Sequence, residues 1–292
     1  MNNFRFPFFA VLILLFFSQC TDTSSKESLK NINPVPKVER KRTKPANIQY
    51  TIVKKKKWSA DSLSANELAI LSAVNRTDKA HLVRMDSILV PADLSGDIEY
   101  YLPFPLTVSA FKDIDKIIFF SYPAQSFGAY EHGELVYAGP TNMGRKADPT
   151  PTGLYFTNWK AEKTTSTFND EWELKWNFNI QNKEGIGWHE YEMPGYPASH
   201  SCLRLTEKDA KYLYDWADEW IIKGTDNILA QGTPVIVFGN YSFGKPKPWW
   251  RLSGDPDALN ISEQTLQQLA APYLNKILQE QMKRAKLNSK KS

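Results

Sequence analysis

One short segment, Ser199–Leu205, carries the residue types of nucleophilic catalysis. It reads Ser-His-Ser-Cys-Leu-Arg-Leu, so Cys202 directly follows a small polar turn that contains His200. A second histidine, His189, lies shortly upstream. A thiol needs a base or an ion-pair partner to act as a nucleophile, and either histidine could provide it. We take Cys202 as a candidate nucleophile and His189 as the better base candidate, because a loop containing Pro and Gly separates the two.

The same segment offers the other groups that acyl transfer needs. The backbone N–H groups of Ser201 and Cys202, expected at the start of a helix, are candidates for an oxyanion hole. A helix start there also predicts a lowered thiol pKa. Arg204 is a candidate to hold a substrate carboxylate with two hydrogen bonds.

Two other readings of these residues remain open. A lone cysteine is more often a small buried apolar residue than a nucleophile. His189, His200 and Cys202 could in principle bind zinc, but the chain has no paired-histidine motif or acidic ligand at a typical spacing. We expect neither a metal nor an organic cofactor.

Strands are expected to hold these residues in place. The hydrophobic pattern predicts a hairpin with its turn at His132-Gly133, and several further strands. The segment Glu173–Ile180 alternates apolar and polar residues, as a half-buried strand does. The expected strands are Lys116–Ser121, Phe127–Glu131, Glu134–Ala138, Leu154–Trp159, Glu173–Ile180 and Thr233–Phe238.

Two helical segments are expected after the cysteine. Thr206–Lys223 has one apolar stripe, Thr206 as N-cap and Gly224 at the position that ends a helix. An amphipathic helix is expected across Ser262–Leu287, with an interruption near Pro272.

The N-terminus predicts export. Arg5 precedes a short apolar run, Phe6–Phe17, which is too short for a comfortable membrane span. The run ends at Cys20 in a sequence that resembles a bacterial lipobox, so Cys20 is a candidate lipidation site. An ordinary cleaved signal and an uncleaved anchor remain alternatives. We expect an exported, lipid-anchored protein on the periplasmic side of a bacterial membrane, in which Cys202 has no disulfide partner.

Composition divides the chain into five parts. Residues 1–20 are the signal, 21–57 a flexible polar tether, 58–95 a small helical unit, 112–240 the main domain and 241–292 an extension with a basic tail. The unit 58–95 weakly resembles a LysM carbohydrate-binding module and is equally consistent with a helical lead-in. The net charge is +4 and no nucleic-acid module is present, so no nucleic-acid partner is expected.

Taken together, these residues resemble the L,D-transpeptidase catalytic domain family of YkuD type. That family carries a His, a loop, then Ser/Thr-His-Gly-Cys followed by an apolar residue and Arg or Asn; here it reads His189, residues 190–198 and Ser199–Arg204. Gly144 with Thr150–Gly153 and Thr233–Val235 also match. The resemblance covers Lys112–Gly239 and implies a mainly β fold with α, a sandwich or barrel-like domain with a helix after the cysteine.

The resemblance implies a role for each residue of the signature. Cys202 would be the acylated nucleophile and His189 the base, oriented by the backbone carbonyl of Glu190. The remaining roles fall to neighbours: His200 and Ser201 line the oxyanion hole with Cys202, and Ser199, Glu190 and Arg204 are substrate-binding candidates. Ser201 replaces the usual Gly, which would be costly where φ is positive. The short loop 190–198 and an insertion before Asn182 bear on substrate specificity.

The implied activity is ping-pong acyl transfer on peptidoglycan stem tetrapeptides. The thiolate would attack the carbonyl of the L-centre and expel the terminal D-Ala, and an amine of a second stem would form a 3→3 cross-link. Water as the acceptor would instead give an L,D-carboxypeptidase or a hydrolase that releases wall-attached proteins. A non-catalytic peptidoglycan-binding lipoprotein is the alternative of another class. A redox role for Cys202 would need a resolving cysteine, and Cys20 is a poor candidate.

Overall fold

The computed structural model describes Met1, residues 40–166 and residues 173–290. The chain divides into two units, Met1–Lys41 and Arg42–Ser292, and every element below belongs to the second. The expected signal segment, Cys20 and the first part of the expected tether lie outside the described residues. Among the residues that are described, no helix has both the length and the apolar character needed to cross a membrane.

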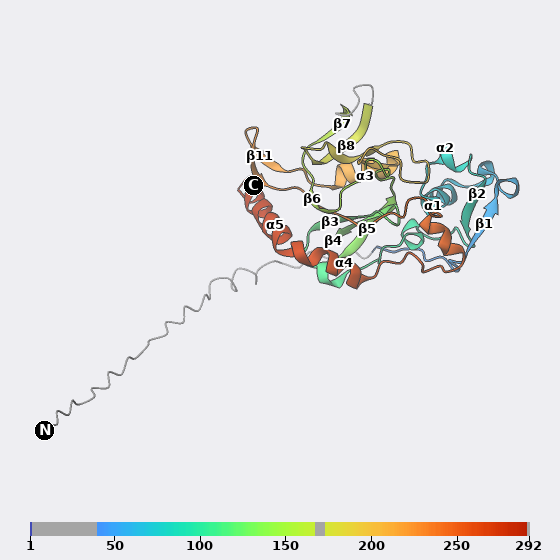
Figure 1. The fold of residues 1–292 in the computed structure, drawn as a ribbon, viewed down its shortest axis with the longest axis horizontal. Helices are drawn as coiled ribbons and strands as arrows, with labels where there is room; N and C mark the ends of the chain where they lie inside the picture. Colours follow the sequence, from blue (N-terminus) through green and yellow to red (C-terminus); the bar gives the residue numbers. More distant parts are fainter. Residues whose placement is uncertain (2–39, 167–172, 291–292) are drawn as a thin grey trace. The chain divides into compact units, whose positions relative to one another are not determined.

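Two β-sheets packed against each other form the main domain (Figure 1). The larger sheet has the strand order β5-β4-β3-β13-β6, in which β3 and β13 are parallel and the other pairs antiparallel. Its strands are β3 (Lys116–Ser121), β4 (Ser126–Glu131), β5 (Glu134–Pro140), β6 (Gly153–Phe156) and β13 (Pro234–Phe238). The smaller sheet has the order β10-β9-β8-β7, and its strands are β7 (Lys160–Thr165), β8 (Glu173–Gln181), β9 (Ile186–Glu190) and β10 (Leu203–Leu205).

Both faces of the larger sheet are covered. Ile118 and Phe120 of β3 point toward the smaller sheet and pack with Trp188, while Ile117 and Phe119 point the other way into a second core. This follows from the period of two in a strand, and it explains why β3 reads as a continuous apolar run. The fold class expected from the sequence, mainly β with α, is confirmed.

The expected hairpin is also confirmed as β4 and β5. His132 and Gly133 occupy the turn with φ of 48° and 80°, the left-handed pair that suits a tight hairpin. A Cβ on Gly133 would lie 2.5 Å from the carbonyl oxygen of Val108, so close backbone packing as well as conformation favours glycine here.

The helix after the cysteine is shorter than expected. Helix α3 spans Glu207–Trp216, with Thr206 accepting a hydrogen bond from the Asp209 N–H as its N-cap. It ends because Ala217 is extended, and the chain then forms a hairpin of β11 (Ile221–Lys223) and β12 (Asn227–Ala230). Gly224 does have positive φ, 71°, but in the hairpin turn. The expected helix to Lys223 was wrong in its second half.

The predicted helical unit 58–95 and the end of the predicted tether together form a β-α-α-β unit. Its elements are β1 (Tyr50–Lys54), α1 (Ala65–Asn75), α2 (Lys79–Leu82) and β2 (Ser87–Pro91), with β1 antiparallel to β2. The expectation of a flexible tether up to Lys57 is therefore corrected, because Tyr50 is buried and its strand pairs along its whole length. Only Tyr50 of this strand is buried, and the lysines that follow it in the sequence made the whole stretch resemble a tether.

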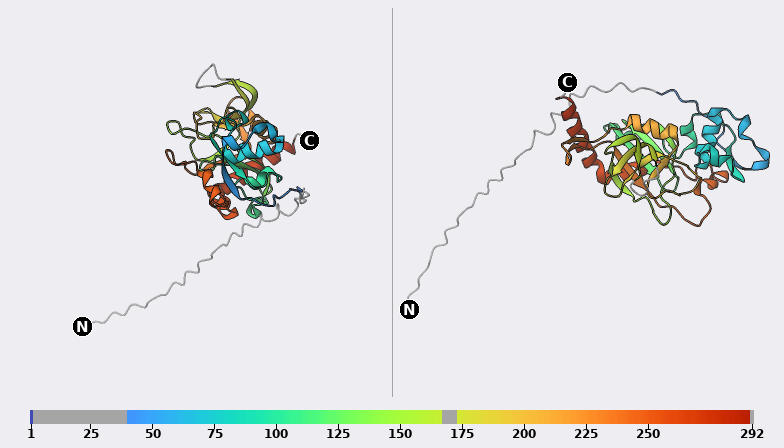
Figure 2. Two further views of the ribbon diagram at one scale, coloured as in Figure 1. Left: turned by 90° about the vertical axis from the view of Figure 1, so that its right-hand side faces the viewer. Right: turned by 90° about the horizontal axis from the view of Figure 1, so that it is seen from above.

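The C-terminal extension covers the second core. The helices are α4 (Glu263–Ala270) and α5 (Leu274–Asn288), joined by a 3₁₀ turn that contains Pro272, so the expected interrupted helix is confirmed. Leu266 and Ile277 bury their side chains against the larger sheet. Helix α5 and the β-α-α-β unit lie at opposite ends of the main domain (Figures 1 and 2).

Candidate active site

The pairing of two short strands brings the candidate nucleophile and base together. Strands β9 and β10 are parallel, with Leu203 opposite Trp188 and Arg204 opposite His189. Cys202 precedes β10 and therefore lies level with the start of β9, while Trp188 and Leu203 point into the core. His189 and Cys202 both line one cavity on the other side of the sheet.

His189 is held in a single orientation. Its Nδ1 lies 3.0 Å from the carbonyl oxygen of Glu190, and its ring packs edge-on against Tyr191 with centroids 5.8 Å apart. A carbonyl can only accept a hydrogen bond, so Nδ1 carries the proton and Nε2 is left free to accept one. Burial lowers the pKa of His189 to about 4, because the hydrogen bond to the Glu190 carbonyl only partly offsets the loss of solvation and Arg204 adds a like charge.

Cys202 is half-buried, and burial raises the pKa of its thiol. A hydrogen bond with the Gly187 backbone and the positive charge of Arg204 both lower this pKa, but by less than burial raises it. The expectation of a thiol at a helix start was wrong, since the whole of β10 separates Cys202 from the first turn of α3. A helix dipole acts within its first turn, so it supplies no strong stabilisation of a thiolate or of an oxyanion here.

The turn before Cys202 is tied to the loop of residues 144–150. Ser201 adopts a φ of 75°, the left-handed conformation in which a side chain is costly. Its carbonyl accepts a hydrogen bond from Thr150 Oγ1 at 2.9 Å, and its hydroxyl lies 3.3 Å from the carbonyls of Asp148 and Pro149. Inside the turn, the Ser199 hydroxyl donates to the Cys202 carbonyl at 2.5 Å.

The remaining predicted residues fall into different places. His200, Ser199 and Arg204 line the cavity with Cys202, whereas Glu190 contributes its carbonyl to His189. The guanidinium of Arg204 lies 4.4 Å from the ring centre of Tyr191 and donates to the carbonyl of Glu192 at 3.3 Å. It therefore already stabilises the loop after β9, and one side of it faces the cavity.

The cavity has a volume of about 590 Å³, counted with the open space at its mouth. Strands β7 and β8, with the residues on either side of β7, form its second wall, which the sequence did not indicate as part of a site. The wall is mostly polar and consists of Trp159, Thr164, Thr165, Ser166, Leu174, Asn177 and Asn179. The signal available in the sequence was a pair of asparagines, Asn177 and Asn179, at alternate positions of one strand.

The loop between β9 and the cysteine turn is clamped from outside the main domain. Asp78 accepts a hydrogen bond from the Met193 N–H at 2.7 Å, and Thr77 Oγ1 donates to the Met193 carbonyl at 2.8 Å. From the same loop, Gly195 has a φ of 79°, and a Cβ there would lie 2.5 Å from Met85. The β-α-α-β unit thus shapes the loop that joins His189 to Ser199.

In the part of the chain that the structure describes, no three His, Cys, Asp or Glu side chains gather as metal ligands would. The three residues considered for zinc, His189, His200 and Cys202, all line the cavity but do not make such a group.

Comparisons with known proteins point to one family. Residues 115–237 match the family model described as YkuD, L,D-transpeptidase catalytic domain. Similar solved structures include an L,D-transpeptidase from Stackebrandtia nassauensis, 23% identical with a TM-score of 0.36, covering 44% of this chain and 57% of that one. An L,D-transpeptidase from Mycobacterium smegmatis is 19% identical, with a TM-score of 0.35 and coverage of 43% and 59%. One from Mycobacterium tuberculosis H37Rv is 21% identical, with a TM-score of 0.35 and coverage of 43% and 58%. The chain thus spans less than two thirds of these proteins, and no curated protein matches it.

Proposed function

We propose that this protein, whose residues 115–237 are a YkuD-type L,D-transpeptidase catalytic domain, cross-links peptidoglycan stem peptides through an acyl-enzyme on Cys202. The observation that carries the proposal is the parallel pairing of β9 and β10, which brings Cys202 and an Nδ1-anchored His189 to one cavity. Nucleophile, base and the group that orients the base are the three parts of a cysteine acyltransferase.

The free enzyme holds a neutral thiol and a neutral imidazole. Burial raises the pKa of Cys202 and lowers that of His189 to about 4, so neither group is charged near neutral pH. We infer that His189 acts as a general base during attack, taking the thiol proton on Nε2 as the sulfur–carbon bond forms. This differs from a resting thiolate–imidazolium pair, in which the proton would already have moved.

The first half-reaction transfers the acyl group to sulfur. The sulfur attacks the carbonyl carbon of the stem tetrapeptide at its L-centre, and the carbonyl oxygen becomes an oxyanion facing the N–H groups of the turn 200–202. When the intermediate collapses, the carbon–nitrogen bond to the terminal D-Ala breaks and His189 returns its proton to the leaving amine. A thioester on Cys202 remains.

The second half-reaction releases the product. The amine of a second stem attacks the thioester, His189 takes the excess proton from the nitrogen, and the carbon–sulfur bond breaks. The thiolate recovers a proton from His189, so the enzyme is regenerated without ATP or a cofactor. Arg204 and Ser199, which border the cavity, are the proposed contacts of the stem peptide in both steps.

We further propose that the protein acts outside the cytoplasm, where peptidoglycan lies, and that Cys20 anchors it to the membrane through lipid. The first part rests on the family, and the second on the lipobox-like sequence alone.

Intact mass of the full chain tests the proposal. The protein is incubated with a disaccharide-tetrapeptide or, separately, with a carbapenem, which the resemblance suggests will acylate the same thiol. We expect a mass gain that is absent in Cys202→Ala, and muropeptide products that distinguish cross-links from hydrolysis. Hydrolysis alone would change the assignment to an L,D-carboxypeptidase. No adduct with either reagent, in a folded protein, would refute an acyl-enzyme and leave a peptidoglycan-binding lipoprotein.

A further inference from the structure

Asn177 of strand β8 is a buried polar residue that faces the cavity without a partner. Its exposed fraction is 5%, and it borders the same cavity as Cys202 and His189. Across the described part of the chain, its side-chain carboxamide makes no hydrogen bond. Its amide atoms are not among the fully buried side-chain atoms that lack a partner, so the amide is open to the cavity. A largely buried amide that no protein group occupies, beside Cys202, is available to a ligand.

A β-bulge places this amide opposite the candidate base. Lys175 pairs with Glu190 and Phe178 with Trp188, so Trp176 and Asn177 together lie opposite the single residue His189. Trp176 has a φ of 53°, which is rare for a bulky aromatic residue. Bulges next to active sites serve to redirect side chains, and this one adds a residue at the position where β8 passes His189.

The bulge reverses which side chains face the cavity. Before it, Leu174 lines the cavity; after it, Asn177 and Asn179 line the cavity and Phe178 lies in the core. Trp176 packs edge-on against Tyr214, with ring centroids 5.5 Å apart, and the ammonium of Lys211 lies 5.1 Å from its ring. The aromatic contacts on α3 therefore hold the strained residue in place, and the strain of about 1–3 kcal/mol is local to the cavity wall.

Asn179 lies on the same cavity wall, but its side-chain amide is hydrogen-bonded to other protein groups. Its exposed fraction is 4%, and its Oδ1 accepts a hydrogen bond from Asn158 Nδ2 at 2.9 Å. Its Nδ2 also lies 3.4 Å from the carbonyl of Gln181. Asn177 and Asn179 thus line one cavity from one strand, and among the described residues only the amide of Asn179 has hydrogen-bond partners.

We propose that Asn177 is a substrate-binding residue, whose amide pairs with a main-chain peptide group of the donor stem peptide beside Cys202. The inference rests on the proposed function and adds a specificity residue to it. A peptide group offers one C=O acceptor and one N–H donor, which match the Nδ2 donor and the Oδ1 acceptor of an asparagine. An apolar ligand would leave both atoms of the amide unpaired, and a simple carboxylate would leave Oδ1 without a donor.

Equilibrium binding in a protein that cannot be acylated tests this. The affinity of a disaccharide-tetrapeptide is measured by calorimetry for Cys202→Ala and for the double variant Cys202→Ala with Asn177→Leu. Loss of one or two hydrogen bonds to neutral groups should weaken binding about 10- to 100-fold. Because Asn177 has no protein partner, its replacement by an apolar residue of similar size should leave the melting temperature unchanged or raise it.

Asn179→Leu is the matched control. It removes the nearer of the two side-chain acceptors of Asn158, so we expect the melting temperature to fall. A fall of the same size for Asn177→Leu would show a structural role and overturn the inference.

The outcomes separate this inference from the proposed function. Equal affinity with and without Asn177 overturns the inference, even if the wild-type protein forms an acyl-enzyme. The expected loss of affinity in a protein that never becomes acylated supports the binding role and refutes the transpeptidase. No binding to either variant overturns both.

Discussion

Polar groups around the cavity and polar groups beneath helix α5 differ in how completely the protein pairs them through hydrogen bonds. At the cavity, the amide of Asn177 lacks a partner in the described protein, and burial lowers the pKa of His189 to about 4. The backbone there is also strained, with positive φ at Trp176 and Ser201. The positive φ values raise the free energy of the folded state at the cavity, and the lowered pKa of His189 does so only at acid pH.

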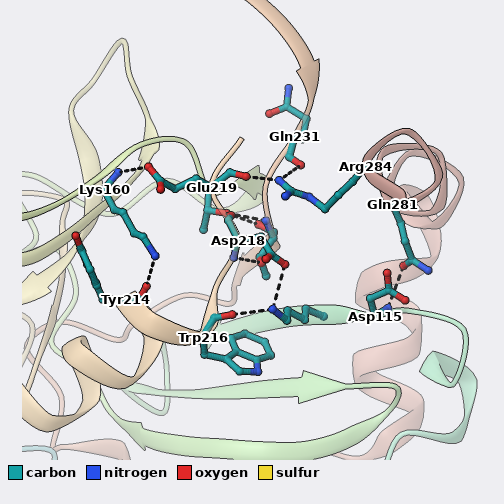
Figure 3. Close-up of polar contacts among 12 residues, drawn as sticks. Asp115, Lys160, Tyr214, Trp216, Asp218, Glu219, Gln231, Gln281 and Arg284 are labelled. Carbon is teal, nitrogen blue, oxygen red and sulfur yellow. Dashed lines mark hydrogen bonds and ion pairs between the residues drawn. The ribbon is translucent and has the colours of Figure 1, made fainter. Parts of the chain in front are cut away.

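Beneath α5, polar groups are paired (Figure 3). Arg284 donates to the carbonyls of Glu219 and Gln231, and Glu280 accepts from the Gln231 N–H at 2.9 Å. The amide of Gln281 both donates to the Asp113 carbonyl and accepts from the Asp115 N–H, each at 3.0 Å.

The difference separates two tasks. Strain and unpaired groups persist only where the surrounding structure holds them, and they concentrate at functional sites. Here the contacts of α3 with Trp176 hold the strained wall of the cavity, whereas the hydrogen bonds of α5 lie elsewhere in the domain. Changes to the strained or unpaired residues of the cavity should therefore alter activity and improve or hardly affect stability, whereas changes to the hydrogen bonds of α5 should alter stability and leave activity intact.

The largest expected effect is the acid sensitivity that His189 adds. Its folded pKa, about 4, is lower than its ordinary value of 6.5, so the stability it contributes is present above pH 6.5 and lost as pH falls toward 4. The loss is on the order of 3 kcal/mol. His189→Gln stays neutral, so its stability relative to wild type should rise by that amount between pH 7 and pH 4, measured by urea unfolding.

The stability of His189→Gln is compared with that of wild type because Asp209 titrates in the same pH range and affects stability in the opposite direction. Burial raises the pKa of Asp209 from 3.8 to about 6, so its stabilising contribution is present below pH 4 and lost as pH rises through 6. Asp209→Asn is therefore the control and should gain stability at pH 7 instead. A difference curve for His189→Gln that is flat with pH would contradict a buried neutral histidine.

The next effect concerns the hydrogen bonds between helix α5 and the rest of the domain. Arg284→Ala leaves two carbonyl acceptors without a charged donor, so we expect a loss of about 2 kcal/mol in the free energy of unfolding. Lys286→Ala, at an exposed basic position on the same helix, should change it by less than about 0.5 kcal/mol. Acylation of Cys202, measured below the melting temperature, should be the same in both variants; slower acylation in Arg284→Ala would break the separation drawn above.

Much of the secondary structure around the cavity and at the C-terminus could be predicted from the sequence. The strands that became β3, β4, β5 and β8 have clear apolar patterns, and the short range of a hairpin turn makes β4 and β5 readable. The interrupted C-terminal helix was equally local, since Pro272 removes a backbone donor.

What escaped prediction depends on contacts between distant segments. Strand β1 is a short apolar stretch next to a run of lysines, and its pairing with β2 is a contact that the segment alone does not reveal. The second half of the predicted helix likewise pairs with β12 as β11. The bulge at Trp176 hides inside a regular apolar alternation, so Leu174 and Phe178 appeared to share a face. The thiol environment was mispredicted because the three residues of β10 separate the cysteine from the helix.

A smaller effect tests the clamp on the loop after β9. Asp78→Ala leaves the Met193 N–H without its acceptor, and we expect kcat/KM to fall about tenfold because the loop between His189 and Cys202 is less well positioned. Asp78→Asn keeps an acceptor and should largely restore it. Asp97→Ala is the control, since the Asp97 carboxylate accepts a hydrogen bond from the Thr43 N–H at 2.8 Å instead of from the loop after β9. Full kcat/KM in folded Asp78→Ala would show that the clamp has no part in catalysis.

The smallest effect lies in the turn itself. A φ of 75° at Ser201 costs about 1–2 kcal/mol for a residue with a Cβ, and glycine avoids it. Glycine also adds entropy to the unfolded chain, and the contacts of the hydroxyl at 3.3 Å are weak, so Ser201→Gly should gain only about 0.5 kcal/mol. Ser201→Ala keeps the strain and loses the contacts, so it should be slightly less stable than wild type. Denaturant midpoints rank the three proteins. If Ser201→Gly proved the least stable, the hydroxyl contacts to Asp148 and Pro149 would outweigh the strain. The turn at Ser201 would then be stabilised by paired polar groups, as the contacts of α5 are.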